Sequence, residues 1–264
     1  MLLTGKKIFL TGGSRGLGKS TVLELVRNGA DVAFTYHNRK DEAEKTLQEI
    51  KGINPGSLSR YYQLDVTDSG KVNSITDRVI EDMGRVDVVV NNAGNLRDNL
   101  VYSMSDEDWD FVMKIHLYGT FYVCRAFLEE FMYNKGGRFI NIASLSYTGA
   151  AGQANYSAAK AGVIGFSKAM AKEYGNRDIY CNVIVPGFFK TDLTDSTASE
   201  IITKYYLRLS MLQREGDPAE LGKAVVFLAS GLSSFINGEI LHVTGGLETV
   251  PPVSERRKKK KGRS

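Results

Sequence analysis

The 264-residue sequence is poor in several features that would each define a class of protein. Two cysteines without a C-x-x-C pair predict buried free thiols, and three scattered histidines show no metal-ligand spacing. No linker rich in Pro, Ser or Gly divides the chain, which favours one domain over two. No apolar run approaches the 18 or more residues of a membrane span, and a strand pattern at Lys7 leaves no room for a signal peptide. These absences predict a cytoplasmic protein without metal.

The net charge of +4 is concentrated at one place in the chain. Residues 255–263 carry seven basic groups and one acid, so the rest of the chain has a charge of about −2. Because the rest of the chain is nearly neutral, we expect no broad basic surface that would bind nucleic acid. Residues 251–264 are predicted to be a disordered, solvated tail, and the alternative is a docking segment for an acidic partner or a membrane.

Short apolar runs alternate with helical patterns along the chain. Runs rich in Val and Ile, bounded by turns and separated by helices, indicate parallel strands covered on both faces. Right-handed crossovers then give a single-domain α/β fold over residues 1–250, a doubly wound Rossmann-type parallel sheet with ligands at the carboxyl ends of its strands. The seven predicted strands are residues 7–11, 32–36, 61–64, 86–90, 139–143, 180–185 and 240–243.

A glycine-rich turn follows the first predicted strand. Gly12, Gly16 and Gly18 stand between this strand and a helical pattern over 19–28, which is the context of a dinucleotide fingerprint, here spaced G-x-x-x-G-x-G. Such a turn lets the backbone approach a pyrophosphate and presents the N–H groups of a helix N-terminus to it. The alternative is a plain strand–helix turn, which can use one glycine but has little need of three.

Tyr156 and Lys160 are four residues apart on a predicted helix and therefore share one of its faces. A lysine ammonium beside a phenol favours the phenolate, so we expect it to lower the tyrosine pKa from about 10 toward working pH. A tyrosine tuned in this way can exchange a proton with a carbonyl or an alcohol. Ser144, which closes the predicted strand 139–143, could hold the same oxygen. Such a pair alone occurs often by chance; the glycine turn gives it weight.

Together with Asn91-Asn92-Ala93-Gly94 and Pro186-Gly187, these motifs resemble the short-chain dehydrogenase/reductase family over about residues 4–247. The segments 92–100 (NAGNLRDNL), 152–160 (GQANYSAAK) and 186–193 (PGFFKTDL) look most like β-ketoacyl-[acyl carrier protein] reductases. The resemblance implies the strand order 3-2-1-4-5-6-7 and NADPH-dependent reduction of a 3-oxoacyl thioester on acyl carrier protein, in fatty-acid or polyketide-type synthesis. The alternatives are an NADP(H)-dependent oxidoreductase of a small free ketone, alcohol, sugar or steroid, and an inactive cofactor-binding scaffold.

The resemblance also implies roles for individual residues. Hydride passes to a carbonyl carbon while Tyr156 protonates the oxygen, Ser144 hydrogen-bonds it, and Lys160 tunes Tyr156 and holds the nicotinamide ribose. Ser144 stands one residue closer to Tyr156 than is usual, which leaves Ser146 as an alternative. Asn91 is expected to brace the sheet. The remaining implied cofactor contacts are Gly12, Ser14, Arg15, Gly16, Leu17, Gly18, His37, Arg39, Asp65, Val66, Asn92, Ala93, Gly94, Pro186, Gly187 and Thr191.

We expect NADPH rather than NADH because the second predicted strand lacks the acid that binds the ribose hydroxyls in NAD-selective folds. That strand ends in Tyr36-His37-Asn38-Arg39. Arg15 in the glycine turn could pair bidentately with a 2′-phosphate, with His37 and Arg39 as further donors. The alternative is that Arg15 is a solvated loop residue.

His116 stands where similar proteins commonly carry an asparagine of the proton relay. Histidine can pass protons and titrate near neutrality, so a relay role is one hypothesis and an ordinary, satisfied helix residue is the other.

The predicted helix from Asp106 to about residue 132 opens on a capping box at Ser105 and carries more aromatic residues than one core-facing stripe needs. The excess indicates a second face against another subunit, as in the dimers or tetramers of similar proteins, or else burial within the chain.

Residues 188–215 show no clear period and are predicted to be a substrate cover. Because acyl carrier proteins are acidic, a reductase that serves them needs basic residues at the mouth of its site. Lys135 and Arg177 resemble the family's docking residues; the alternative is solvated surface charge.

Overall fold

In the computed structural model, residues 1–189 and 200–247 are described, without the side chains of 200–204. Their seven strands form one parallel sheet in the order β3-β2-β1-β4-β5-β6-β7, which confirms the predicted fold class and strand order. The strands are β1 (Lys7–Leu10), β2 (Asp31–Tyr36), β3 (Arg60–Gln63), β4 (Val88–Asn91), β5 (Gly137–Ile142), β6 (Ile179–Pro186) and β7 (Ile240–Val243).

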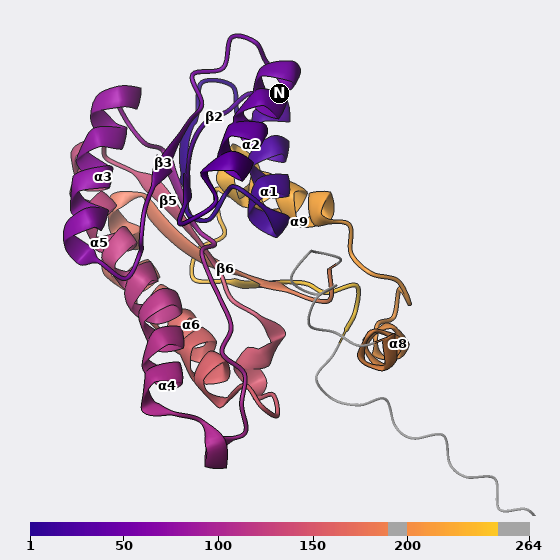
Figure 1. The fold of residues 1–264 in the computed structure, drawn as a ribbon. Coiled ribbons are helices and arrows are strands. Elements are labelled where there is room, and N and C mark those ends of the chain that lie inside the picture. Colours follow the sequence, from indigo (N-terminus) through magenta and orange to yellow (C-terminus); the bar gives the residue numbers. More distant parts are fainter. Residues whose placement is uncertain (190–199, 248–264) are drawn as a thin grey trace, which may run out of the picture.

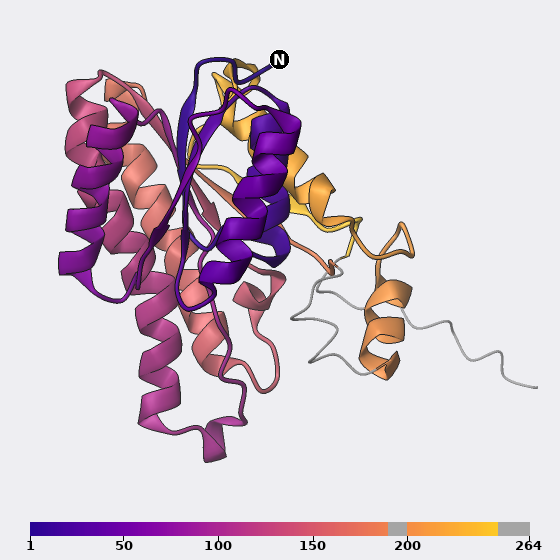
Figure 2. The ribbon, with the colours of Figure 1, turned by 45° about the horizontal axis from the view of Figure 1, so that its top comes forward.

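Helices cover both faces of this sheet (Figures 1 and 2). One layer consists of α1 (Gly16–Arg27), α2 (Lys40–Ile53) and α9 (Pro218–Ala229), and the other of α3 (Ser69–Met83), α5 (Gly119–Tyr133) and α6 (Ala154–Tyr174). Side chains alternate between the layers, because successive residues of a strand point to opposite faces. Ile8 and Leu10 of β1 pack in the first layer, whereas Phe9 packs against Phe127 of α5 in the second.

A buried polar network connects the centre of the sheet to α6. Asn91 Nδ2 donates to Asn141 Oδ1 at 2.8 Å, and Asn141 Nδ2 donates to Ser167 Oγ at 2.8 Å. All three side chains are buried, so each bond forms in a medium of low polarity, where a satisfied network fixes its elements in one arrangement. The network confirms that Asn91 braces the sheet, and it also positions α6.

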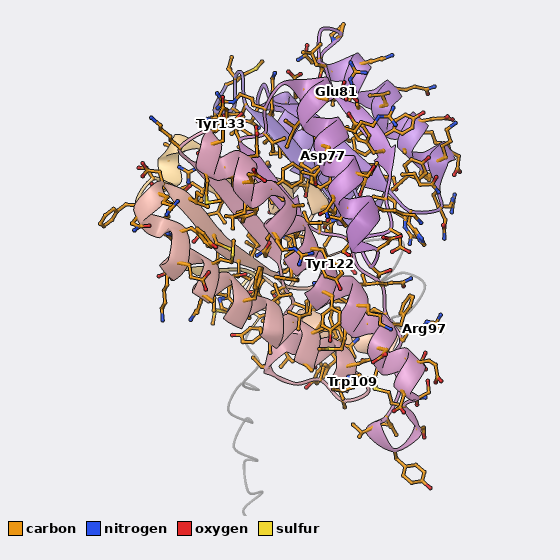
Figure 3. All side chains as sticks on the ribbon, turned by 90° about the vertical axis from the view of Figure 1, so that its left-hand side faces the viewer. Asp77, Glu81, Arg97, Trp109, Tyr122 and Tyr133 are labelled. Carbon is orange, nitrogen blue, oxygen red and sulfur yellow. The ribbon has the colours of Figure 1, made fainter. Side chains whose placement is uncertain are left out.

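The predicted long helix is a continuous run that changes its winding in the middle. It consists of α4 (Asp106–Met113), a π-helical turn η2 (Lys114–Tyr118) and α5, and Ser105 Oγ accepts from Asp108 N at its start. Phe127 and Phe131 are buried, whereas Trp109, Tyr118 and Phe121 are exposed. Figure 3 shows Trp109 near one end of this run, Tyr122 in its middle and Tyr133 at the other end. One group of aromatic side chains therefore faces the core and another faces outward, and the contact of the outer group with another subunit stays a prediction.

The segment predicted to be an irregular cover contains a helix, α8 (Glu200–Leu209), so that part of the prediction is wrong. The ring of Phe188, after β6, stacks on Tyr206 of α8 at 5.3 Å, and Ser210 Oγ donates to Gly245 O at 2.9 Å. These contacts hold α8 beyond the carboxyl ends of β6 and β7 (Figure 1). Thr191 and the basic tail lie outside the described residues.

The remaining described elements are short 3₁₀ turns: η1 (Val101–Ser103), η3 (Leu145–Thr148), η4 (Gly175–Arg177) and η5 (Gly231–Ser233). None of the helices in 1–189 and 200–247 combines the length and the apolarity of a membrane span.

Candidate active site and cofactor groove

A groove of about 430 Å³ opens at the carboxyl edge of the sheet, where the strand order reverses between β1 and β4. This topological switch point is where open α/β sheets bind their ligands. Many of the predicted cofactor contacts line the groove: Gly12, Ser14, Arg15, His37, Arg39, Asp65, Val66, Ala93 and Gly94. Gly16, Leu17, Gly18, Asn92, Pro186 and Gly187 are not part of this lining.

The glycine turn requires glycine both for its conformation and for its packing. Gly12 and Gly16 have φ values of 70° and 54°, in the left-handed region, and a Cβ at Gly18 would collide with the carbonyl oxygen of Gly12. Asn92 Nδ2 supports the turn from behind by donating to the carbonyl oxygens of Thr11 and Gly12, both at 3.0 Å. Asn92 therefore shapes the turn without lining the groove.

The N-terminus of α1 is suited to an anion. Arg15 occupies the N-cap position and makes no capping hydrogen bond with its side chain, and the first turn of the helix holds no acid. The first N–H groups of a helix have no partner within it, and the helix dipole adds positive potential there. A pyrophosphate in the groove would meet these donors, which is the fit that a dinucleotide requires.

Three basic residues line the groove after β1 and β2, Arg15, His37 and Arg39, and they differ in the partners that they already have. Arg39 donates to both carboxylate oxygens of Asp41, at 3.2 and 3.1 Å, and His37 Nε2 lies 3.7 Å from Asp65 Oδ2. Burial raises the pKa of Asp65, but the hydrogen bonds from Thr67 outweigh this effect and the net shift is downward. Arg15 makes no ion pair with the described part of the chain, so it is the cation most available to a ligand.

Ser144, Tyr156 and Lys160 come together beside this groove, Ser144 after β5 and the other two on the first turns of α6. Lys160 Nζ donates to Ile142 O at 2.6 Å and lies over the Tyr156 ring, 5.5 Å from its centroid. Ser144 is close enough to lower the Tyr156 pKa through a hydrogen-bond interaction. Ser146 Oγ instead donates to Gln153 Oε1 at 2.8 Å, so the geometry favours Ser144 over Ser146.

Burial dominates the titration of this group. It raises the pKa of Tyr156 to about 12, although the Ser144 interaction lowers it, and Asp98 adds a further upward effect. Burial also lowers the pKa of Lys160 to about 7. The expected lowering of the Tyr156 pKa by Lys160 is therefore not found. Desolvation disfavours both the phenolate and the ammonium, so at neutral pH the Tyr156 hydroxyl keeps its proton.

His116 lies in the π-helical turn and reaches the site from behind. Its ring is buried and stands edge-on to the Tyr156 ring, with centroids 5.0 Å apart and an interplanar angle of 80°. Burial lowers its pKa well below the ordinary value, the charge of Lys160 lowers it further, and the hydrogen bond to Asn95 raises it. The expectation that His116 titrates near neutrality is wrong, because the charged form would be buried beside a cation.

Lys135 and Arg177 do not lie at the mouth of this groove. They precede β5 and β6, so in a parallel sheet they fall at the amino edge, whereas the groove lies at the carboxyl edge. Their two loops are neighbours, joined by Gly137 N donating to Asp178 O at 3.1 Å. The two basic residues therefore lie on adjacent loops, and the expectation that they stand at the mouth of the groove of the same chain is wrong.

Two polar residues near Tyr156 were missed by the sequence analysis. Asn155 is fully buried, donates to Arg97 O at 2.9 Å and accepts from Tyr156 N at 2.7 Å, which ties the start of α6 to the loop after β4. Gln153 Nε2 donates to Asp98 Oδ2 at 2.8 Å. Arg97 and Asp98 lie more than 50 residues away in sequence, so no local pattern predicts the bonds to them. No group of His, Cys, Asp and Glu within the described ranges could hold a metal ion.

The comparisons with known proteins agree with this geometry. A family model described as "Enoyl-(Acyl carrier protein) reductase" matches residues 12–248. The chain is 37% identical over 246 residues to the 3-oxoacyl-[acyl-carrier-protein] reductase FabG of Chlamydia pneumoniae, covering 93% of this chain and 98% of that protein. It is 39% identical over 251 residues to the protein of the same name from Salmonella typhimurium, covering 95% and 100%. A crystal structure of a protein classed with the short-chain alcohol dehydrogenases, from Sinorhizobium meliloti, is similar with a TM-score of 0.88 and 30% identity, covering 93% of this chain and 97% of that one.

Proposed function

The chain belongs to the short-chain dehydrogenase/reductase family, and we propose that it reduces the 3-oxo group of an acyl thioester carried by an acyl carrier protein, with NADPH. One observation carries the proposal: Ser144, Tyr156 and Lys160 meet near a groove lined by predicted dinucleotide contacts, in a chain 37% identical to a 3-oxoacyl-[acyl-carrier-protein] reductase. Fatty-acid or polyketide-type synthesis would use this reaction. A cytoplasmic location is part of the proposal, supported by two free, buried cysteines.

NADPH, when bound, supplies the hydride, and the residues of the chain hold the reactants and move the proton. The Tyr156 hydroxyl, whose pKa of about 12 keeps it protonated at neutral pH, donates its proton to the carbonyl oxygen. Ser144 would hydrogen-bond the same oxygen through its hydroxyl, and Lys160, which lies over the Tyr156 ring, would hold the nicotinamide ribose. The groove-lining residues would hold the adenosine and pyrophosphate portions, and Arg15 would pair with the 2′-phosphate. Pro186, Gly187 and Thr191 are assigned to the nicotinamide end.

The description of the matching family model favours a second candidate, reduction of an enoyl thioester. That reaction ends with a proton on carbon, whereas ketone reduction ends with one on oxygen. Two hydroxyl groups, from Ser144 and Tyr156, approach each other at this site, which suits a single oxygen atom that accepts from both. We therefore place 3-oxoacyl reduction before enoyl reduction and before reduction of a small free ketone.

A substrate panel tests the proposed function. NADPH oxidation would be followed with 3-oxobutanoyl and 2-butenoyl thioesters on the same acyl carrier protein, and with a small free ketone at the same concentration. We expect kcat/KM for the 3-oxobutanoyl thioester to exceed the other two by at least about 100-fold, as for a site built around one polar group. A faster 2-butenoyl reaction would support the enoyl candidate, and a faster free ketone would remove the carrier protein from the proposal.

We also propose a homodimer or tetramer built on the exposed aromatic side chains of α4 and α5. In a two-fold interface the same face of each copy packs against the other, so the two long helices can run antiparallel. The Tyr133 end of one copy would then lie near the Trp109 end of its partner (Figure 3). Trp109 lies on the carboxyl side of the sheet, where the groove opens, and Tyr133 on the amino side.

In such a pair, Lys135 and Arg177 of one copy could serve the groove of the other, although they are far from their own. Charge reversal at both positions should raise KM for a carrier-bound substrate several-fold and leave a small thioester without the carrier unchanged. Added salt should reduce the difference by screening. Equal effects on both substrates, or none on either, would remove these residues from the docking proposal.

A further inference from the structure

His116 lies between two parts of the proposed site that come from different segments of the chain, the loop after β4 and the start of α6. Its ring contacts the backbone of Asn95 on one side and the Tyr156 ring on the other. The residue stands in the middle of the π-helical turn, and π-helical turns inside α-helices are frequent at functional sites. Within the described residues, its Nδ1 is the buried side-chain nitrogen or oxygen atom that lacks a hydrogen-bond partner. Such an atom in a native structure calls for an explanation.

The contact with Asn95 supports the wall of the cofactor groove. His116 Nε2 lies 2.8 Å from Asn95 O and 3.3 Å from Asn95 N. Gly94 is so close to the imidazole that a Cβ there would collide with its Cε1 atom. Gly94 and Asn95 both line the groove, whereas His116 stands behind them. The ring therefore fixes the backbone that a cofactor would touch.

The two contacts favour different tautomers, because Asn95 N, at 3.3 Å, would donate to an Nε2 without hydrogen, whereas Asn95 O, at 2.8 Å, needs a hydrogen on Nε2. We assign the hydrogen to Nε2, because the shorter contact is to a carbonyl oxygen, which can only accept. In a neutral ring Nδ1 then carries the lone pair, which is consistent with an Nδ1 that finds no acceptor nearby. The tautomer that supports the wall thus leaves the imidazole without a second proton to give.

The contact with Tyr156 is of a different kind. The edge-on arrangement, at 5.0 Å and 80°, is the favoured geometry of two aromatic rings and restrains the direction of the phenol. Lys160 Nζ, 5.5 Å from the same ring centroid, lies over the ring face. His116 and Lys160 thereby hold the Tyr156 side chain, and a small misplacement of a proton donor lowers the rate of reaction.

We propose that His116 is a positioning residue with two separable tasks: its Nε2–H supports the Gly94–Asn95 wall of the cofactor groove, and its ring orients Tyr156. It carries no proton in the reaction. The second task rests on the proposed function, because it concerns the turnover of the substrate, whereas the first concerns only cofactor binding.

Two substitutions separate these tasks. His116→Asn keeps an N–H donor near Asn95 O but removes the ring, so kcat should fall about 3- to 10-fold while the Kd for NADPH changes less than about 2-fold. His116→Phe keeps the ring but removes the donor, so the Kd for NADPH should rise about 3- to 10-fold with a smaller change in kcat. Changes in the same parameter for both variants, or no change in either, would overturn the proposal.

A spectroscopic measurement on the wild-type protein tests the tautomer without any variant. In ¹⁵N-histidine-labelled protein, which contains three histidines, we expect one ring protonated only on Nε2, with shifts constant between about pH 6 and 8. The assignment of this ring would come from its loss in His116→Asn. The proposal would be overturned if the ring of His116 were protonated on Nδ1 or titrated in this range. Because NADPH binding and the tautomer need no substrate, a negative substrate panel would leave this test intact.

Discussion

Replacement of Arg15 by alanine should remove most of the proposed preference for NADPH over NADH. Arg15 and Arg39 both line the groove, and from the sequence either could bind a 2′-phosphate. In the structure the Arg39 guanidinium already donates to both oxygens of Asp41 and lies 3.4 Å from Glu42. A ligand would have to compete with these carboxylates for Arg39, whereas Arg15 has no such pair among the described residues.

The size of the effect follows from the energy of a charge-assisted hydrogen bond. Such bonds contribute about 1.5–3 kcal/mol, which corresponds to about 10- to 150-fold in affinity. Arg15 is exposed, so solvent screening places its contribution toward the lower end of this range. We therefore expect Arg15→Ala to raise the Kd for NADPH about 10-fold and to leave the Kd for NADH within about 2-fold. Higher salt should reduce the difference between the two cofactors.

Fluorescence titration of NADPH and NADH would measure these constants for wild type, Arg15→Ala and the matched control Arg39→Ala. The control should change the Kd for NADPH less than about 3-fold, because Arg39 is already paired. Equal affinities of the wild-type protein for the two cofactors would refute the reasoning. A larger effect of Arg39→Ala than of Arg15→Ala would also refute it.

Two further predictions concern stability. Burial lowers the pKa of Lys160 from 10.5 to about 7, so between these values the unfolded chain binds more protons than the folded protein. The free energy of unfolding should therefore rise with pH between about 7 and 9, by at most about 1.4 kcal/mol per pH unit, before the raised pKa values of the buried Cys124 and Cys181 thiols act in the opposite direction. Urea titrations of Lys160→Met should lack this rise, and an unchanged slope would contradict the prediction. Asn141→Ala removes the bonds that Asn91 and Ser167 make to Asn141 and should lower the free energy of unfolding by about 1–3 kcal/mol. The exposed control Asn134→Ala should lower it by less than about 0.5 kcal/mol, and equal losses would contradict the prediction.

The parts of the fold that repeat along the chain were predictable from the sequence. Each strand is a short apolar run between turns, and a parallel sheet with right-handed crossovers admits few strand orders. The glycine turn was predictable for a similar reason, since Gly12 and Gly18 meet a steric requirement within seven residues. The grouping of Ser144, Tyr156 and Lys160 was predictable because Ser144 follows a strand and the other two residues share one face of a helix. In all these cases the decisive interactions are local.

Most of what could not be predicted depends on contacts between distant segments. The pairing of Arg39 is the exception: Asp41 stands two residues away, but the sequence does not show which rotamers bring the two side chains together. The π-helical turn at His116 follows a helical pattern that shows no break. Lys135 and Arg177 were expected at the mouth because they flank site elements in the sequence, whereas the direction of the strands places them at the other edge. The pKa of Tyr156 was expected to fall, but desolvation could only be judged from the packing.

The central claim is that Tyr156 delivers the proton to a carbonyl oxygen at this site. A single-turnover experiment tests it most directly: protein saturated with NADPH is mixed with the 3-oxobutanoyl thioester of acyl carrier protein, and the loss of NADPH absorbance is followed. We predict that Tyr156→Phe lowers the rate constant at least about 100-fold while the Kd for NADPH stays within about 3-fold of wild type. A Tyr156→Phe protein that binds NADPH and turns over within a few-fold of wild type would contradict the account.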